Sequence, residues 1–120
     1  MAEWNALVVE DDLHSGQILS HILQHYNIDV DVAPDAEEAL TRLANHEYSV
    51  AIVDLALPGM SGWELIEVIR QDNSVMPCVA VTAYYDSKVE QQAVEAGFKA
   101  CFPKPVNMNF VQELAEALER

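Results

Sequence analysis

A regular alternation of short strand-like runs with amphipathic segments constrains the fold of this chain more than any other feature. Residues 6–9, 50–53 and 78–81 are continuously apolar, as expected for strands buried on both faces of a parallel sheet. Residues 28–32 alternate apolar and acidic side chains and predict a more exposed strand, and residues 99–102 predict a short fifth strand. Between these runs, apolar residues recur at helical spacing and predict five helices.

The predicted helices also carry boundary signals. Pro34 is expected near the first turn of the second helix. Ser61 and Glu64 form a capping box for the third. The fourth spans about residues 86–96, and the fifth begins near Asn107. Five strand–helix units with short connections predict an α/β domain with a doubly wound parallel sheet, and five strands favour the flavodoxin-like order 2-1-3-4-5.

Length and charge limit the classes of protein that the chain can represent. Its 120 residues suit one domain, expected over residues 1–120. The formal net charge of −14 would repel nucleic-acid phosphates and attract cations and basic partner surfaces. The first residues lack the basic region of a signal peptide, and no apolar run approaches the roughly 20 residues that span a bilayer. We therefore expect a cytoplasmic protein without membrane or direct nucleic-acid contact, in which Cys78 and Cys101 are buried, reduced thiols.

Polar side chains of complementary chemistry follow the predicted strands. The acidic run at residues 10–12 follows the first strand, and Asp54 follows the third. Thr82 follows the fourth strand, and the fifth leads into Lys104. In a sheet of order 2-1-3-4-5, sites form beyond the carboxyl ends of strands 1 and 3, where the strand order reverses. The sequence therefore predicts carboxylates, a hydroxyl and an ammonium around one crevice.

Such a crevice favours phosphoryl transfer. Neighbouring carboxylates repel one another and would have raised pKa values unless a cation joined them, and Mg²⁺ prefers their oxygen ligands. Beside Mg²⁺ and Lys104, Asp54 can attack phosphorus as an aspartyl nucleophile. Each of these residues alone is more commonly a helix cap or a solvated side chain, so the prediction depends on their shared position at strand ends.

Ordered motifs resemble those of the receiver domains of bacterial two-component response regulators. The match runs from about Leu7 to Leu118 and includes LVVEDD at 7–12, VDLALPGMSG at 53–62, VTA at 81–83, AG at 96–97 and KP at 104–105. The resemblance implies a receiver domain that takes a phosphoryl group from a histidine kinase or a histidine phosphotransfer protein. Such a domain catalyses only its own phosphoryl transfer and dephosphorylation. It also implies that the fourth helix, fifth strand and fifth helix form a face that binds a downstream effector or a second copy.

The resemblance assigns roles to individual positions. Asp54 matches the phosphoacceptor, Thr82 the hydroxyl that hydrogen-bonds the phosphoryl group, and Lys104 the lysine that pairs with it. The implied Mg²⁺ ligands are Asp11 directly, Glu10 through a metal-bound water, Asp54, and the backbone carbonyl of Ala56. Asp12 is expected to cap the first helix, and the bond before Pro105 is similar to one that is cis in the family.

Several positions depart from the family pattern or lie outside its motifs. Cys101 stands where members commonly carry an aromatic side chain that rotates inward, so this part of the switch is expected to be absent or reassigned to Phe102. Pro103 fits an edge strand because proline cannot donate to a ladder. Tyr84, beyond the threonine, is expected to shield the phosphoryl group from water. His14, His21 and His25 are expected to form an exposed stripe of the first helix, with a metal or pH role as the alternative.

Two other functions are kept as alternatives. A receiver that no longer accepts a phosphoryl group would serve only as an interaction module, which the complete set of site residues argues against. A phosphatase of the haloacid dehalogenase type needs an acid two residues after its aspartyl nucleophile, where this chain has Ala56, and no cap domain is present. The sequence is compatible with a stand-alone receiver and with one domain of a longer protein.

Overall fold

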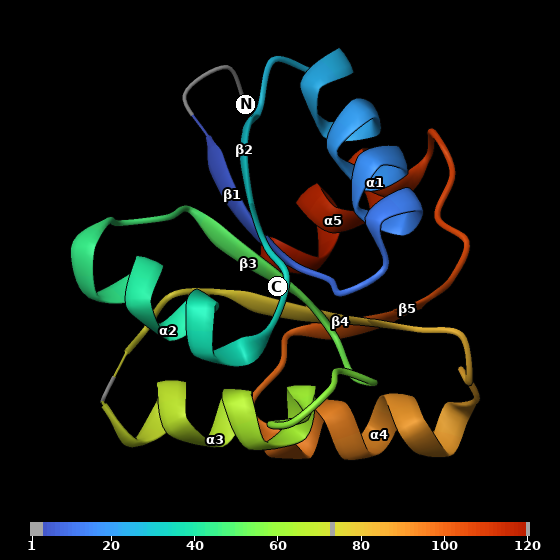
Figure 1. The fold of residues 1–120 in the computed structure, drawn as a ribbon. Coiled ribbons are helices and arrows are strands. Elements are labelled where there is room, and N and C mark those ends of the chain that lie inside the picture. The colour runs from blue at the N-terminus through green and yellow to red at the C-terminus, as the bar shows by residue number, and fades with distance from the viewer. Residues whose placement is uncertain (1–3, 73, 120) are drawn as a thin grey trace.

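The computed structural model describes residues 4–72 and 74–119 and shows a five-stranded parallel sheet between two layers of helices (Figure 1). The elements are β1 (Asn5–Val9), α1 (Leu13–His25), β2 (Asp29–Ala33), α2 (Ala36–Asn45), β3 (Val50–Asp54), α3 (Gly62–Gln71), β4 (Cys78–Thr82), α4 (Ser87–Ala96), β5 (Ala100–Pro103) and α5 (Phe110–Leu118). The strand order is β2-β1-β3-β4-β5, which confirms the predicted flavodoxin-like order. None of the described helices has the length and apolar character needed to cross a membrane.

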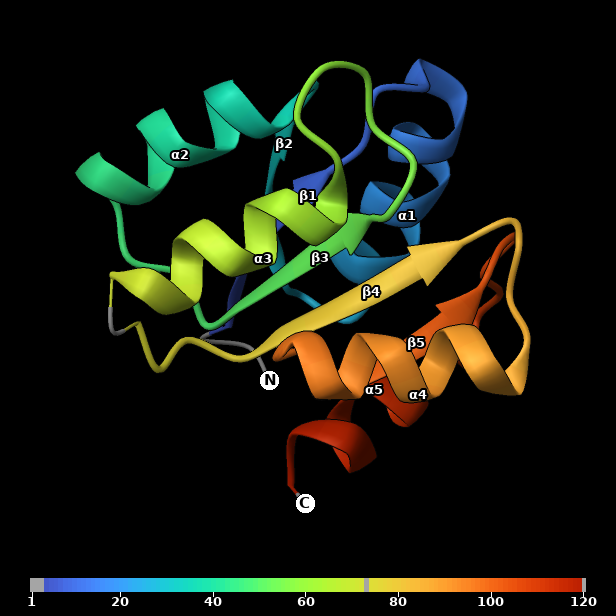
Figure 2. The same ribbon diagram turned by 90° about the horizontal axis from the view of Figure 1, so that it is seen from below.

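Two apolar clusters join the helices to the sheet, one on each face. α1 and α5 cover one face, where Leu23 and Phe110 pack in a cluster with Ile52 of the central strand. α2, α3 and α4 cover the other face, where Leu65 and Ile66 belong to the second cluster (Figure 2). Burying such a side chain completely contributes roughly 1.5–3 kcal/mol. Since successive strand residues point to opposite faces, the central strands must be apolar throughout.

The element boundaries follow the sequence signals with small shifts. Asp12 caps α1 through the backbone N–H of Ser15, and the predicted capping box opens α3. Asp35 caps α2, and Pro34 lies directly before the cap, near the first helical turn as predicted. α5 begins at Phe110, later than predicted, because the Asn107 side chain accepts a hydrogen bond from the backbone N–H of Asn109 and forms a turn there.

Candidate functional site

The carboxyl ends of β1 and β3 bring three carboxylates together. The two strands are paired neighbours, and the chain enters the loop with Glu10 after β1 and reaches Asp54 at the end of β3. Carboxylate oxygens of Glu10, Asp11 and Asp54 lie within 4.8 Å of one another. Glu10 and Asp54 are buried, whereas Asp11 is exposed. The carboxylates predicted to meet at the point of strand reversal therefore do so, and this cluster, called the acidic crevice below, can hold a metal ion.

Lys104 joins two of these carboxylates. Its Nζ donates hydrogen bonds to Glu10 Oε1 at 2.7 Å and to Asp54 Oδ2 at 3.0 Å. The backbone N–H of Lys104 donates to the carbonyl of Thr82 at 2.9 Å, which fixes the start of the loop after β5. The Lys104–Pro105 peptide bond is cis, as the resemblance implied.

Burial and hydrogen bonding shift the pKa of Glu10 in opposite directions, and they do the same for Lys104. Burial raises the pKa of Glu10 above its ordinary value of 4.5, and the hydrogen bond from Lys104 offsets only part of that rise. Burial acts to lower the pKa of Lys104, but the hydrogen bonds to Glu10 and Asp54 outweigh it, so its pKa is raised. Three carboxylates against one ammonium leave two negative charges, which a divalent cation would cancel.

Two backbone N–H groups orient the side-chain oxygens of Asp54 and Thr82. The N–H of Ala56 donates to Asp54 Oδ1 at 3.0 Å, and the N–H of Tyr84 donates to Thr82 Oγ1 at 3.0 Å. Thr82 is 3% exposed. Because its hydroxyl oxygen accepts this bond, the hydroxyl proton remains available for donation. Neither contact was foreseen from the sequence, since each depends on the path of the loop after a strand.

The turn after Asp54 depends on two glycines for different reasons. Gly59 has a φ of 70°, a left-handed conformation that side chains with a Cβ adopt at a cost. A Cβ placed on Gly62 would lie 2.5 Å from the carbonyl oxygen of Asp54 and 2.8 Å from the Cα of Leu55. The start of α3 therefore packs directly against the backbone of the acidic residue, and only glycine permits this approach.

Phe102 and Cys101 point to opposite faces of the sheet, and whether the aromatic switch is absent or reassigned to Phe102 stays a prediction. The ring of Phe102 packs edge to face against Phe110 with 5.2 Å between centroids, in the cluster beneath α1 and α5. Cys101 lies in the cluster on the opposite face of the sheet, because successive residues of β5 point in opposite directions. Cys78 and Cys101 are both buried and free, and burial raises the pKa of each thiol to about 11.

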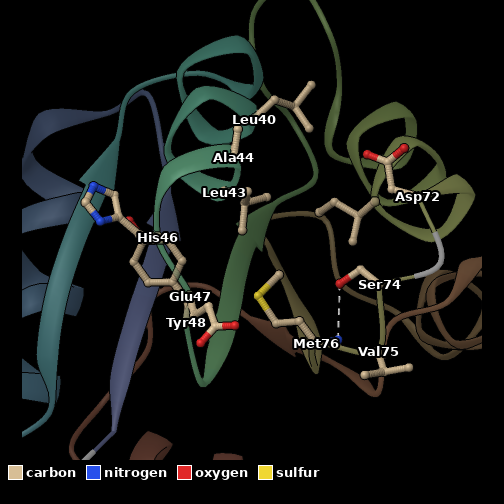
Figure 3. Close-up of a pocket in the computed structure, with 11 residues that line it drawn as sticks. Leu40, Leu43, Ala44, His46, Glu47, Tyr48, Asp72, Ser74, Val75 and Met76 are labelled. Atoms are coloured by element: carbon tan, nitrogen blue, oxygen red, sulfur yellow. Dashed lines mark hydrogen bonds between the residues drawn. The ribbon is translucent and has the colours of Figure 1, made fainter.

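One surface groove, between α2 and α3, lies far from this chemistry. It has a volume of about 490 Å³ and is lined by side chains such as Leu43, Tyr48 and Met76, at the amino-terminal ends of β3 and β4 (Figure 3). Glu47 and Asp72 also line it. Over residues 4–72 and 74–119, the acidic crevice is the only group of three or more potential ligand side chains this close together, so the candidate site is the crevice.

Known proteins resemble the chain in both sequence and fold. The response regulator receiver domain family matches residues 6–118. An uncharacterized 14.6 kDa protein of Leptolyngbya boryana is 35% identical over 109 residues, which cover 89% of this chain and 83% of that protein. The two-component response regulator PhoP of Pseudomonas aeruginosa is 34% identical over 114 residues, or 95% of this chain and 51% of PhoP. The chain thus spans about half the length of PhoP, and it spans 12% of the sensor histidine kinase RcsC of Salmonella typhimurium, to which it is 31% identical.

Solved structures show the same fold. The chemotaxis response regulator CheY4 of Vibrio cholerae superimposes with a TM-score of 0.87 at 26% identity, covering 95% of this chain and 98% of that one. A CheY-like receiver domain protein of Methanospirillum hungatei gives a TM-score of 0.86 at 29% identity, covering 97% and 94%. The DrrB receiver domain activated with BeF3 gives 0.83 at 25% identity, covering 98% of both chains.

Proposed function

The chain belongs to the response regulator receiver domain family of two-component signal transduction, and on this premise we propose that Asp54 accepts a phosphoryl group that switches a partner-binding face. The observation that carries the proposal is the setting of the Asp54 carboxylate. It is 4% exposed, accepts a hydrogen bond from Lys104 at 3.0 Å, and lies in a cluster with Glu10 and Asp11. We assign residues 1–120 to a single receiver domain and expect it to work in the cytoplasm.

The crevice suits Mg²⁺ as a cofactor. Its ligand groups are all oxygen donors, and its two uncompensated negative charges match a divalent cation. Asp11, Asp54 and the backbone carbonyl of Ala56 would hold the ion directly, and Glu10 would act through a bound water. When bound, the ion supplies positive charge to the oxygens of the transferring phosphoryl group.

The side chains around Asp54 then have distinct roles. A carboxylate oxygen of Asp54 forms a bond to phosphorus while the phosphorus–nitrogen bond of a donor phosphohistidine breaks and the imidazole leaves. The Lys104 ammonium, which is already held at Asp54 Oδ2, neutralises charge on one phosphoryl oxygen. The Thr82 hydroxyl donates its free proton to another, while its oxygen keeps the bond from Tyr84. The donor is a histidine kinase or a histidine phosphotransfer protein.

The output face is assigned to α4, β5 and α5. α4 contributes one residue, Ala93, to the buried core, whereas α3 and α5 contribute four each. A helix with so little buried surface is the element that shifts most easily. A shift of α4 would alter the affinity of this face for a downstream effector or for a second copy of the chain. The domain acts on no external substrate and catalyses only its own phosphorylation and dephosphorylation.

Incubation with acetyl phosphate and Mg²⁺, followed by intact mass measurement, tests this function. We expect one labile phosphoryl adduct on the unaltered chain and none on Asp54→Asn or after chelation of the metal. Asp72→Asn is the matched control, because Asp72 is exposed at the far end of the sheet, and it should label normally. Labelling that persists in Asp54→Asn contradicts the assignment. Absence of any adduct favours an interaction module that works without phosphorylation.

A further inference from the structure

The outer face of α1 differs from the surface of every other helix. α1 contains no Asp, Glu, Lys or Arg, whereas each of the other four helices carries at least two acidic residues. In a chain with a net charge of −14, α1 itself therefore contributes no formal charge, and the nearest acids are residues 10–12, which line a groove with His21. Three exposed histidines lie on α1, at positions 14, 21 and 25.

The spacing of these histidines places His21 and His25 close together and His14 apart from them. The buried side of α1 is formed by Gly16, Leu19, Ile22 and Leu23. His21 and His25 are four residues apart, so they lie one turn apart on the opposite side, with Cβ atoms about 5–6 Å from each other. His14 precedes His21 by seven residues, which at ~1.5 Å per residue is about 10 Å along the axis. That distance is too great for His14 to share an ion with the pair.

Two imidazoles one helical turn apart favour a borderline transition metal over Mg²⁺. Zn²⁺ is bound by imidazole nitrogens at about 2.0–2.1 Å and takes four ligands in a tetrahedron. Mg²⁺ prefers oxygen ligands, which α1 does not offer as carboxylates. Within the described chain, no third histidine, cysteine or acidic side chain joins His21 and His25 in a ligand cluster. The pair therefore supplies half of a tetrahedral zinc site.

We propose that a second copy of the chain completes this site with its own His21 and His25, so that Zn²⁺ joins two molecules through α1. A twofold dimer brings the same patch of both copies together, which supplies the two missing imidazoles. On the other helices such a contact would oppose acidic residues, but on α1 it opposes neutral ones. The neighbouring Ile18 is 37% exposed and would be covered in the dimer.

The order of residues along this face supports a helix-to-helix contact. His14, Ile18, His21 and His25 follow one another at spacings of four, three and four residues. This is the spacing of the seam between two helices that pack along their length. The zinc site is independent of Asp54 chemistry, so either proposal can fail without the other.

Sedimentation velocity of the full chain during a ZnCl₂ titration tests the proposal, with Mg²⁺ in excess so that the crevice does not compete for zinc. We expect dimers at a ratio of one zinc ion per two chains. His21→Gln and His25→Gln should each raise the zinc concentration needed for dimerisation by at least tenfold. His46→Gln is the matched control, since it removes an exposed imidazole at the end of α2, outside the proposed interface, and should leave the dimer unchanged.

Three results overturn the proposal. The first is a monomer that binds zinc without dimerising. The second is a dimer that survives both His21→Gln and His25→Gln. The third is loss of the dimer in Asp54→Asn, which would place zinc in the acidic crevice. Circular dichroism of each variant checks that α1 remains folded, so a loss of binding is not confused with a loss of structure.

Discussion

The acidic crevice and the outer face of α1 meet at Asp12, which caps the helix directly after the crevice acids, yet they present polar groups in opposite ways. In the crevice, Glu10, Asp54 and Lys104 come from three different strand ends and are joined by bonds of 2.7 and 3.0 Å. On α1, the imidazoles are exposed and are placed by a single helix. The difference teaches that a phosphoryl site needs charges that tertiary structure assembles and partly desolvates. The half of the proposed zinc site that one chain supplies needs only the local geometry of a helix.

Removing the ammonium of Lys104 should slow phosphorylation in the crevice and leave α1 unchanged. Lys104→Met keeps most of the aliphatic side chain but deletes both hydrogen bonds, so labelling by acetyl phosphate should slow by about 10²-fold or more. Mg²⁺ affinity, measured by calorimetry, should not fall, because a competing positive charge is removed. Lys88→Met, on the exposed face of α4, is the control. A labelling rate within twofold of the unaltered chain would show that Lys104 does not assist transfer.

Alanine substitutions at two glycines compare how each region contributes to the free energy of unfolding. Gly62→Ala should destabilise the protein by roughly 1–3 kcal/mol, because its Cβ would meet backbone atoms of Asp54 and Leu55. Gly16→Ala in α1 should be neutral or stabilising by up to about 1 kcal/mol, because its Cβ finds ordinary contacts, the nearest at 3.6 Å from Val32. Urea unfolding measures both. Equal effects of the two substitutions would refute the difference in packing.

The pH dependence of Mg²⁺ binding should report the burial of Glu10. Its raised pKa means that the folded protein protonates this carboxyl above the ordinary value of 4.5. A proton then competes with the metal, so affinity should fall as the pH is lowered, approaching about tenfold per pH unit below that pKa. In Glu10→Gln the decline should begin at lower pH. An identical decline in both proteins would assign the proton to another group.

The smallest effect is expected at the rim of the crevice. Tyr84 is 77% exposed, and its backbone N–H to Thr82 survives truncation of the side chain. Tyr84→Ala therefore tests only the shielding by the ring, and the phosphoryl lifetime should shorten by about twofold to tenfold, or up to about 1.4 kcal/mol. Tyr26→Ala, beyond the end of α1, should leave the lifetime unchanged. An unaltered lifetime in Tyr84→Ala removes shielding as an explanation.

The sequence by itself determined the layers of the fold and the kinds of side chain that follow the strand ends. Burial on both faces requires continuous apolar runs such as residues 50–53, and that pattern is local. Helix caps are local as well, so Asp12 and Ser61 could be assigned from a few neighbouring residues. The acids at strand ends were identifiable because parallel strands end at one edge of the sheet.

Only the tertiary structure decided how these parts meet. Lys104 contacts Glu10 across 94 residues of sequence and Asp54 across 50, distances over which no periodic pattern carries information. The side of the sheet on which Phe102 packs depends on the register of β5, and a shift of one residue would reverse it. The close approach of Gly62 to Asp54 and the bond from Tyr84 to Thr82 depend on loop paths that the sheet order imposes. Local periodicity thus specifies which residues are buried, and three-dimensional packing specifies which of them touch.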